Sequence, residues 1–355
     1  MYTWCMQVNT SAALVREAVR KLVSAGLDPD EFLHEVSARI RRAVPHDSSA
    51  WMTLDPDTLL PSGALQYDKS PEVIRLLLRN ELLDGDVQSL AELARRTSPV
   101  AALSQLDAGS AANSPRVQQI LRPAGIGDEL RMMLRVGGST WGLGVICREL
   151  GSSAFDADER TFLADIATDI AEGLRRGLSH RPDPDAAILV PGVVAFDLQG
   201  QVVSTSAEAD RMTALMSGDV TSMLYAVAIA ASTHDGASAR VRLTDGQWLL
   251  QGGRMYGTPI DSALVTVALV PAPRADLTSV LLRLHRLSAR EREVAELLMH
   301  GGRTDEIAAR LYISNHTLRD HVKAIFTKVG ARSRSELTAL VSDHTSPPFA
   351  AATHH

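Results

Sequence analysis

Three polar side chains recur at intervals of four residues in the stretch "SNHTLRDHVKAIFTKVG" near the C-terminal end. Asn315, Arg319 and Lys323 would project from one side of a helix, since residues four apart are neighbours on a helix surface. Their amide, guanidinium and ammonium groups are donors suited to base edges and phosphates. The apolar residues between them would face a core: Leu318, Val322, Ile325 and Val329. The alternative for such cations is an ordinary solvated helix face.

The elements around this helix decide between the two readings. A capping box of Ser288 and Glu291 predicts a helix to about Met299, which Gly301-Gly302 would end. Three further helices are predicted to follow. Thr304 would cap the first, whose inner residues are Ile307, Ala308 and Leu311, and Ser314 would cap the second. The third would start at a capping box of Ser333 and Glu336 and run through Leu337, Leu340 and Val341. Two helices joined by the short turn "YIS" indicate a helix-turn-helix.

The four-helix pattern "LSAREREVAELL", "DEIAARLYIS", "HVKAIF" and "SRSEL" closely resembles the LuxR-type DNA-binding domain over residues 287–345. The resemblance implies that residues 315–329 form the recognition helix and that the helix near Leu337 to Val341 supports dimerisation. It assigns base-edge contacts to Arg319, Asp320 and Lys323. The other DNA-binding residues that it implies are Arg303, Thr304, Ser314, Asn315, Thr317, Lys328 and Arg332.

The sequence departs from the family pattern at several of these positions. The family usually has Ser-Asn followed by a basic residue where this chain has Arg303-Thr304-Asp305, and valine where it has Leu318. Asp305 and Asp320 would repel a phosphate, unless Asp320 accepts from a cytosine amino group. We expect His321 to be structural or phosphate-binding, and no metal is expected, because single histidines lack partner ligands.

The charge distribution fits DNA binding by the C-terminal end alone. The 355 residues carry a formal net charge of −6. Residues 287–345 contain nine Arg or Lys and eight Asp or Glu, a charge of +1, whereas residues 314–332 alone carry +3. An acidic remainder limits unspecific adhesion to nucleic acids, while two such helices in a dimer would meet one duplex.

Composition excludes several other classes of protein. Of the 36 basic residues only four are lysine, and no GxxxxGK[ST], HExxH, CxxC or GxSxG motif occurs. The two cysteines, Cys5 and Cys147, are too few for a disulfide framework, and Cys147 in "WGLGVIC" is expected to be buried rather than redox-active. The start of the sequence does not resemble a secretion signal and no apolar run reaches ~20 residues. We therefore expect a cytoplasmic protein without a membrane partner.

Residues 10–177 are predicted to form an α/β domain. Two amphipathic helices, separated at Gly26, precede the strand "SSAWMTL"; further helices are expected after Ser70, around 87–95 and from Pro115, with a loop over 97–114. Two strands separated by Gly137-Gly138 lead to a closing helix with a capping box of Asp156 and Glu159. This hairpin and closing helix resemble the end of a GAF domain, a signal-sensing α/β module.

The central part reads as a second sensor. Residues 178–186, "LSHRPDPDA", are expected to be a linker. Residues 187–272 contain strand-like runs separated by expected turns at Gly200, Asp245-Gly246 and Gly252-Gly253. They are similar to a PAS-type α+β sheet, although a second GAF-like sheet would show the same pattern. Asp197 imitates a phosphoacceptor aspartate, but the required acidic pair and lysine are missing, so a turn residue is expected. Residues 273–286 form the predicted connecting helix.

These observations predict a multidomain protein with two sensor domains and an all-α four-helix DNA-binding domain. The expected function is a one-component, sequence-specific transcriptional regulator without enzymatic activity or cofactor. Expected partners are double-stranded DNA, a second copy in a homodimer, a small-molecule effector and RNA polymerase. We expect an apolar ligand pocket near Trp51, Met132 or Trp141. The alternative is a protein-interaction scaffold or an enzyme-derived domain fused to a DNA-binding tail.

Overall fold

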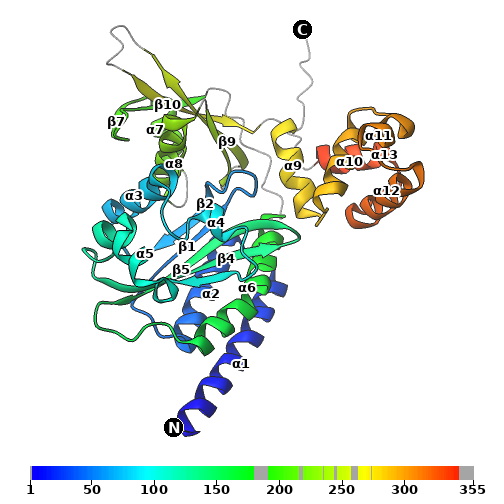
Figure 1. The fold of residues 1–355 in the computed structure, drawn as a ribbon. Coiled ribbons are helices and arrows are strands. Elements are labelled where there is room, and N and C mark those ends of the chain that lie inside the picture. The colour runs from blue at the N-terminus through cyan, green and yellow to red at the C-terminus, as the bar shows by residue number, and fades with distance from the viewer. Residues whose placement is uncertain are drawn as a thin grey trace.

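A computed structural model describes residues 2–179, 191–215, 219–234, 236–243, 246–256, 263–272 and 274–343. Two α/β units and a C-terminal set of helices follow one another along the chain (Figure 1). The described part contains no helix that is both long and apolar enough to cross a membrane. The expected linker lies outside the described residues, apart from Leu178 and Ser179 at the end of a helix.

The first α/β unit is built on an antiparallel sheet with strand order β2-β1-β5-β4-β3. Short π-helical turns at Asn80–Asp84 and Arg116–Leu121 and a 3-10 turn at Leu103–Gln105 complete it. Its elements are α1 (Tyr2–Ala25), α2 (Pro29–Ala43), β1 (Ser48–Leu54), β2 (Pro61–Tyr67), α3 (Pro71–Arg79), α4 (Leu90–Leu93), β3 (Val100–Ala102), α5 (Ala108–Asn113), β4 (Ile126–Val136), β5 (Ser139–Glu149) and α6 (Ala157–Leu178).

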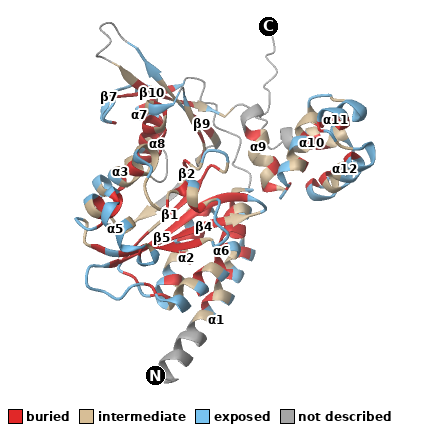
Figure 2. Cartoon of the chain, viewed as in Figure 1, coloured by how far each residue is buried: buried red, intermediate tan, exposed pale blue. Residues whose placement is uncertain are grey.

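Both faces of this sheet are covered. Leu130, Met132 and Leu134 of β4 point to a core shared with α1, α2 and α6, whereas Met133 points to a second core on the opposite face. The strands of the sheet are correspondingly buried in Figure 2. The predicted β4–β5 hairpin is confirmed, and Gly137 and Gly138 have φ values of 62° and 73°, as a two-residue hairpin turn requires.

The second α/β unit repeats the strand order of the first. Its antiparallel sheet has the order β7-β6-β10-β9-β8, which becomes 2-1-5-4-3 when its strands are counted from one, as in the first sheet. Helix α8 covers one face of it (Figure 1). Its elements are β6 (Gly192–Phe196), β7 (Val202–Thr205), α7 (Ala207–Leu215), α8 (Val220–Thr233), β8 (Ala237–Leu243), β9 (Gly246–Met255) and β10 (Leu264–Pro271).

Three local predictions are wrong. The expected loop over 97–114 contains strand β3 and helix α5, and strand β2 was not expected. Gly252 and Gly253 form no turn but lie inside β9, paired with Val267 and Thr266. A side chain on Gly252 would lie 2.8 Å from Cβ of Ala231, so glycine allows α8 to approach the sheet.

Asp197 is a turn residue, as predicted. Its carboxylate accepts from the amides of Gln199 and Gln201 at 2.9 and 2.8 Å, and Gly200 donates to its carbonyl. Cys147 is also buried as expected, and burial raises the pKa of its thiol. Neither side chain therefore has the environment of a reactive group.

Helix α9 (Arg274–Leu284) links the first unit to the C-terminal helices and lies between them in Figure 1. Leu284 is buried in the first unit's core and Leu282 in the C-terminal core. Polar contacts attach the C-terminal half of α9 and the residues after it to the first unit: Arg283 and Ser279 bind Asp57, and Arg286 forms an ion pair with Glu172 at 2.7 Å. The predicted connecting helix is thus an integral part of two cores.

Glu172 is the ionic centre of this attachment. Its carboxylate accepts from Arg175 at 2.8 Å and Arg176 at 2.9 Å as well as from Arg286. Burial acts to raise the pKa of the Glu172 carboxyl, but the hydrogen bonds from the three guanidinium groups outweigh burial and lower the pKa from 4.5 to about 2.

The ion pairs of Glu172 predict a pH-dependent attachment of α9. A carboxyl whose pKa is lower in the folded state stabilises that state above its unfolded value, and the contribution is lost as the pH falls towards the folded value. Glu172→Gln should lower the free energy of unfolding at pH 7 by about 2 to 3 kcal/mol, because two of its three partners are half exposed. Measured by urea unfolding, the difference from the parent should shrink between pH 4.5 and about 2. A difference that stays constant over this range would contradict the ionic role.

A second prediction concerns the packing of the first core. A Cβ on Gly144 of β5 would lie 2.8 Å from Cε3 of Trp51, so Gly144→Ala should lower the free energy of unfolding by about 1 to 3 kcal/mol. Gly253→Ala is the matched control, because a Cβ there meets nothing within 4 Å. Urea unfolding of both variants tests this, and equal stability of the two would contradict it.

Candidate nucleic-acid interface

The C-terminal helices form a small core of their own. They are α10 (Ala289–Met299), α11 (Thr304–Arg310), α12 (Asn315–Val329) and α13 (Arg334–Asp343). The predicted cap of α10 is confirmed: Ser288 accepts from the amide of Glu291 at 3.2 Å, and the Glu291 carboxylate accepts from the amide of Ser288 at 2.6 Å. Residues that join the helices in this core include Val294, Ile307, Leu318, Ile325 and Leu337.

Helix α11 begins at Thr304, but the predicted capping role of Thr304 is wrong. Arg303 occupies the N-cap position, and its amide donates to the Glu306 carboxylate at 3.1 Å. Leu311 to Ile313 then make the turn, and the Ile313 amide donates to the Ala308 carbonyl at 3.0 Å. The next helix starts after Ser314, which accepts from the Thr317 amide at 3.1 Å and confirms the predicted cap.

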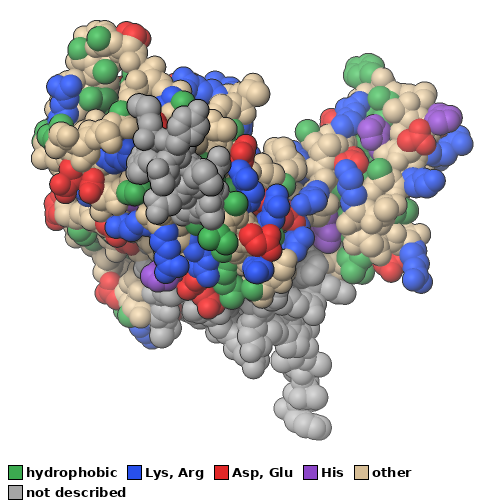
Figure 3. Space-filling view, turned by 90° about the horizontal axis from the view of Figure 1, so that it is seen from below, with side chains coloured by type: hydrophobic (Ala, Val, Ile, Leu, Met, Phe, Trp, Pro, Cys, Tyr) green, Lys and Arg blue, Asp and Glu red, His purple; other side chains and the backbone are tan. Residues whose placement is uncertain are grey.

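Helix α12 has one buried and one exposed side. Leu318 and Ile325 are fully buried, whereas Arg319 and Lys323 are exposed on the outer side together with Asn315. Among the described residues, the side chains of Arg319 and Lys323 form no hydrogen bond or ion pair. Figure 3 shows lysine and arginine side chains over the outer end of the lobe that these helices form. This side of α12 is therefore free for a partner.

Two predicted DNA-binding residues are held by neighbouring side chains. Asp320 lies 3.1 Å from Nδ1 of His316, one turn earlier on α12, and both groups are exposed. Arg303 lies 3.3 Å from a carboxylate oxygen of Asp305, so the acidic residue that departs from the family pattern shields this guanidinium. A phosphate at Arg303 would have to compete with Asp305.

Lys328 has a partner inside the same chain. Its ammonium group donates to both carboxylate oxygens of the buried Glu291, at 2.8 and 2.6 Å, and to the carbonyl of Arg286 at 3.4 Å. Burial acts to raise the pKa of Glu291, but the hydrogen bonds from Lys328 and Ser288 leave it below its ordinary value. Lys328 thus ties α12 to α10, and its phosphate contact stays a prediction.

The remaining candidate residues are distributed as follows. Thr317, Thr304 and Arg332 are exposed, and His321 is half-buried. Leu337 of α13 is fully buried in its own chain, so a dimer contact through this helix would use its other side. Residues 344 and 345 lie outside the described residues.

The three residues expected near a ligand pocket are not brought together around one cavity. Trp51, Met132 and Trp141 are at most 1% exposed and belong to the first unit's core. Trp51 borders a hollow beside α2, Trp141 borders a separate cavity beside α9, and Met132 borders neither of these two. Their part in ligand binding remains a prediction.

Sequence analysis did not select Tyr312 as a candidate. Its side chain is 95% exposed in the turn directly before α12, and its backbone has the unusual φ of 53°. An aromatic residue in a three-residue turn is the only signal that the sequence gives. Its place at the edge of the exposed side of α12 makes it a further candidate for a backbone contact to DNA.

Comparison with known proteins identifies this arrangement of helices. Residues 285–341 match the family of bacterial regulatory proteins of LuxR type. The spore germination protein GerE of Bacillus subtilis is 46% identical over 50 residues, which cover 14% of this chain and 68% of GerE. The chain belongs to the LuxR family. The LuxR-type helix-turn-helix marks a DNA-binding transcriptional regulator, and the recognition of this domain from sequence is confirmed.

The family match covers the C-terminal end of the chain. An HTH-type transcriptional regulator of Aeromonas salmonicida is 48% identical over 59 residues, 17% of this chain and 30% of that protein. The solved structure of Escherichia coli SdiA covers 93% of this chain and 96% of its own, with 11% identity and a TM-score of 0.38. A phycoerythrobilin-bound GAF domain of a cyanobacterial phytochrome covers 48% of this chain and 97% of its own length, with 14% identity and a TM-score of 0.34. Similarities at such low scores show nothing about the role of the two α/β units, whose shared strand order is a property of the chain itself.

The contact between Lys328 and Glu291 gives a testable prediction. Lys328→Met and Glu291→Gln should each lower the free energy of unfolding by about 1 to 2 kcal/mol, since Glu291 is buried and Lys328 is partly exposed. Together the two substitutions should cost less than the sum of the single effects, because they remove the same interaction. Lys323→Met is the control and should leave stability unchanged. Fully additive effects in urea unfolding would contradict the ion pair.

Proposed function

We propose that the chain is a sequence-specific transcriptional regulator whose operator affinity responds to a signal bound by its α/β units. The observation that carries the DNA-binding part is the exposed side of α12, where Arg319 and Lys323 project without partners among the described residues. Two long cationic side chains that lie one helical turn apart fit the major groove, where arginine and lysine donate to guanine O6 and N7.

The residues around this pair divide into two proposed roles. Asn315, Arg319, Asp320 and Lys323 lie along the outer side of α12 and are proposed to meet base edges. Ser314, Thr317 and Arg332 surround them at the ends of the helix and are proposed to contact phosphates, together with Arg303 and Thr304 of α11. Phosphate contacts fix the position of the helix, whereas the base contacts supply specificity.

The signal-responsive part is supported by the attachment of α9. This helix is buried in the first unit's core through Leu284 and in the C-terminal core through Leu282. Any signal that moves α9 against the first unit therefore moves the recognition helix as well. By reciprocity, operator DNA would change the affinity for the signal by the same factor. A homodimer on DNA is part of this proposal, and no catalytic step is needed.

The DNA-binding proposal is tested by binding measurements on selected duplexes. Fragments bound by the full chain are first selected from random DNA. Lys323→Ala and Arg319→Ala should each weaken binding to the selected site by about 1 to 3 kcal/mol and relax the base preference. Lys21→Ala removes an equally exposed lysine from α1 and should change neither quantity. If Lys323→Ala and Arg319→Ala both bound every duplex like the parent, the assignment of α12 to the groove would be wrong.

A further inference from the structure

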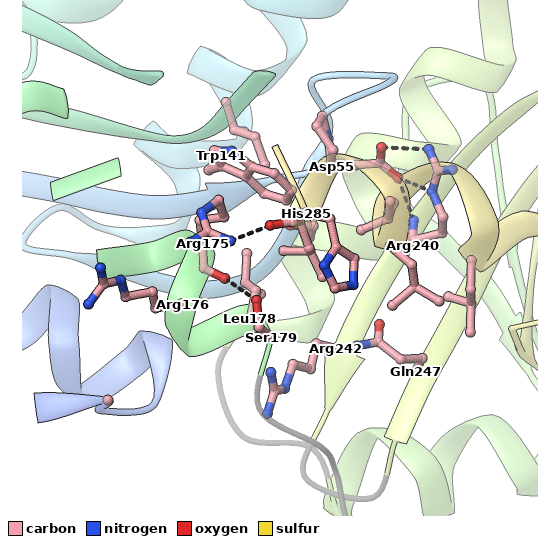
Figure 4. A pocket seen from close by; sticks show the side chains of 18 of the residues that line it. Asp55, Trp141, Arg175, Arg176, Leu178, Ser179, Arg240, Arg242, Gln247 and His285 are labelled. Carbon is pink, nitrogen blue, oxygen red and sulfur yellow. Dashed lines mark hydrogen bonds and ion pairs between the residues drawn. The ribbon is translucent and has the colours of Figure 1, made fainter. Parts of the chain in front are cut away.

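A cavity of about 580 Å³ lies where the two α/β units and α9 meet. This volume falls in the range that small ligands occupy, roughly 300 to 1,000 Å³. The first unit contributes the end of α1, the end of β1 and the last turn of α6, the second unit contributes β8 and β9, and α9 forms one wall (Figure 4). A molecule in this cavity would touch every part of the proposed signalling path.

One wall of the cavity is apolar. Helix α9 contributes Leu277, Val280, Leu281 and Leu284, and Trp141 of β5 lies beside them. These side chains offer no hydrogen-bonding group except the indole nitrogen of Trp141, which donates to the Val136 carbonyl at 3.4 Å. This wall therefore suits the hydrocarbon or aromatic part of a ligand.

Arginines line other parts of the cavity: Arg175, Arg176, Arg240 and Arg242 are drawn among its lining residues in Figure 4. Arg175 and Arg176 share the single carboxylate of Glu172, which also binds Arg286. Arg240 is paired with Asp55 and Asp57, and Asp57 also binds Arg283. Among the described residues, these ion pairs join five guanidinium groups to three carboxylates, and Arg242 also lines the cavity.

Arg242 is the least compensated of these groups. Among the described residues, its guanidinium donates one hydrogen bond, to the Gly177 carbonyl at 2.8 Å, and forms no ion pair. Burial lowers its pKa, and the charge of Asp28 acts weakly in the opposite sense. A half-buried cation with most of its donors unused is costly unless an anion reaches it.

We propose that this cavity binds an amphipathic anion, with its carboxylate or phosphate head on Arg242 and its apolar body along α9. The proposal rests on the proposed signal-responsive function and names the chemical class of the signal and its place. The site lies between the units. Of the three residues near which sequence analysis expected a pocket, Trp141 borders this cavity, whereas Trp51 and Met132 do not.

The position of the site also indicates how a signal would reach DNA. Leu281 lines the cavity and packs against both the first unit's core and the C-terminal core. The apolar body of a ligand in contact with Leu281 and Leu284 would change the packing of α9 against the first unit. Binding energy that differs between two positions of α9 then becomes a difference in operator affinity.

The test compares pairs of probes that differ in their head group alone. Decanoate and 1-decanol, and 2-naphthoate and 2-naphthol, are titrated into the full chain by calorimetry, with acetate as the anion without an apolar body. At least one acid should bind about tenfold more tightly than its alcohol, because a charged hydrogen bond to Arg242 is available. Acetate should bind more weakly than either acid.

Variants locate the binding. Arg242→Gln should remove the preference for the acid, and Arg242→Lys, which keeps the charge, should retain part of it. Arg95→Gln removes an exposed arginine of the first unit that does not line the cavity, and this variant should bind like the parent. Val280→Glu puts a carboxylate on the wall formed by α9 and should weaken the acids as well. Thermal unfolding of each variant shows that it is folded.

The outcomes separate the cavity from the proposed function. Calorimetry requires no DNA, so acids that bind no better than their alcohols, or that bind Arg242→Gln as tightly as the parent, overturn the amphipathic anion. If the acid binds as expected but leaves the affinity for the selected duplex unchanged, the cavity assignment stands and the signal-responsive function fails. A shift in duplex affinity that disappears in Arg242→Gln supports both.

Discussion

The orientation of α12 depends on α9, a helix of eleven residues that is buried in two cores. Burying a leucine side chain contributes about 1.5 to 3 kcal/mol, and α9 buries Leu284 in one core and Leu282 in the other. Separating the C-terminal helices from the first unit would expose at least one of these side chains. The DNA-binding domain is therefore positioned by the first α/β unit, and the connection differs from a flexible tether.

Arginine dominates the polar contacts that support this arrangement. Inside the first unit, Arg116 binds Glu129 and Arg131 binds Glu81, with all four side chains nearly buried. A planar guanidinium can satisfy several acceptors at once, which suits such buried positions better than an ammonium group. Two of the four lysines, by contrast, lie on α12, where Lys323 faces solvent and Lys328 bridges to α10. These buried ion pairs of the first unit thus use arginine, whereas both lysines of α12 are at least partly exposed.

Features set by neighbouring residues could be predicted from the sequence. The capping boxes at Ser288 and Asp156, the glycine turn at 137 and 138, and the two sides of α12 depend on residues a few positions apart. Strand β2 and the glycines inside β9 could not be predicted, because pairing partners and the closeness of α8 decide them. The cavity beside α9 was out of reach for the same reason, since its lining runs from Val23 to His285.

The two leucines of α9 also fix a helical phase. An α-helix advances 100° and 1.5 Å with each residue. The number of residues between Leu284, which packs in the first unit, and Leu282, which packs against the C-terminal helices, therefore sets the orientation of α12. Adding or removing a single residue there would turn the exposed side of α12 through more than a quarter of a circle. Chimeras that exchange sensors between regulators of this architecture must therefore keep the spacing across α9 as well as the domains themselves.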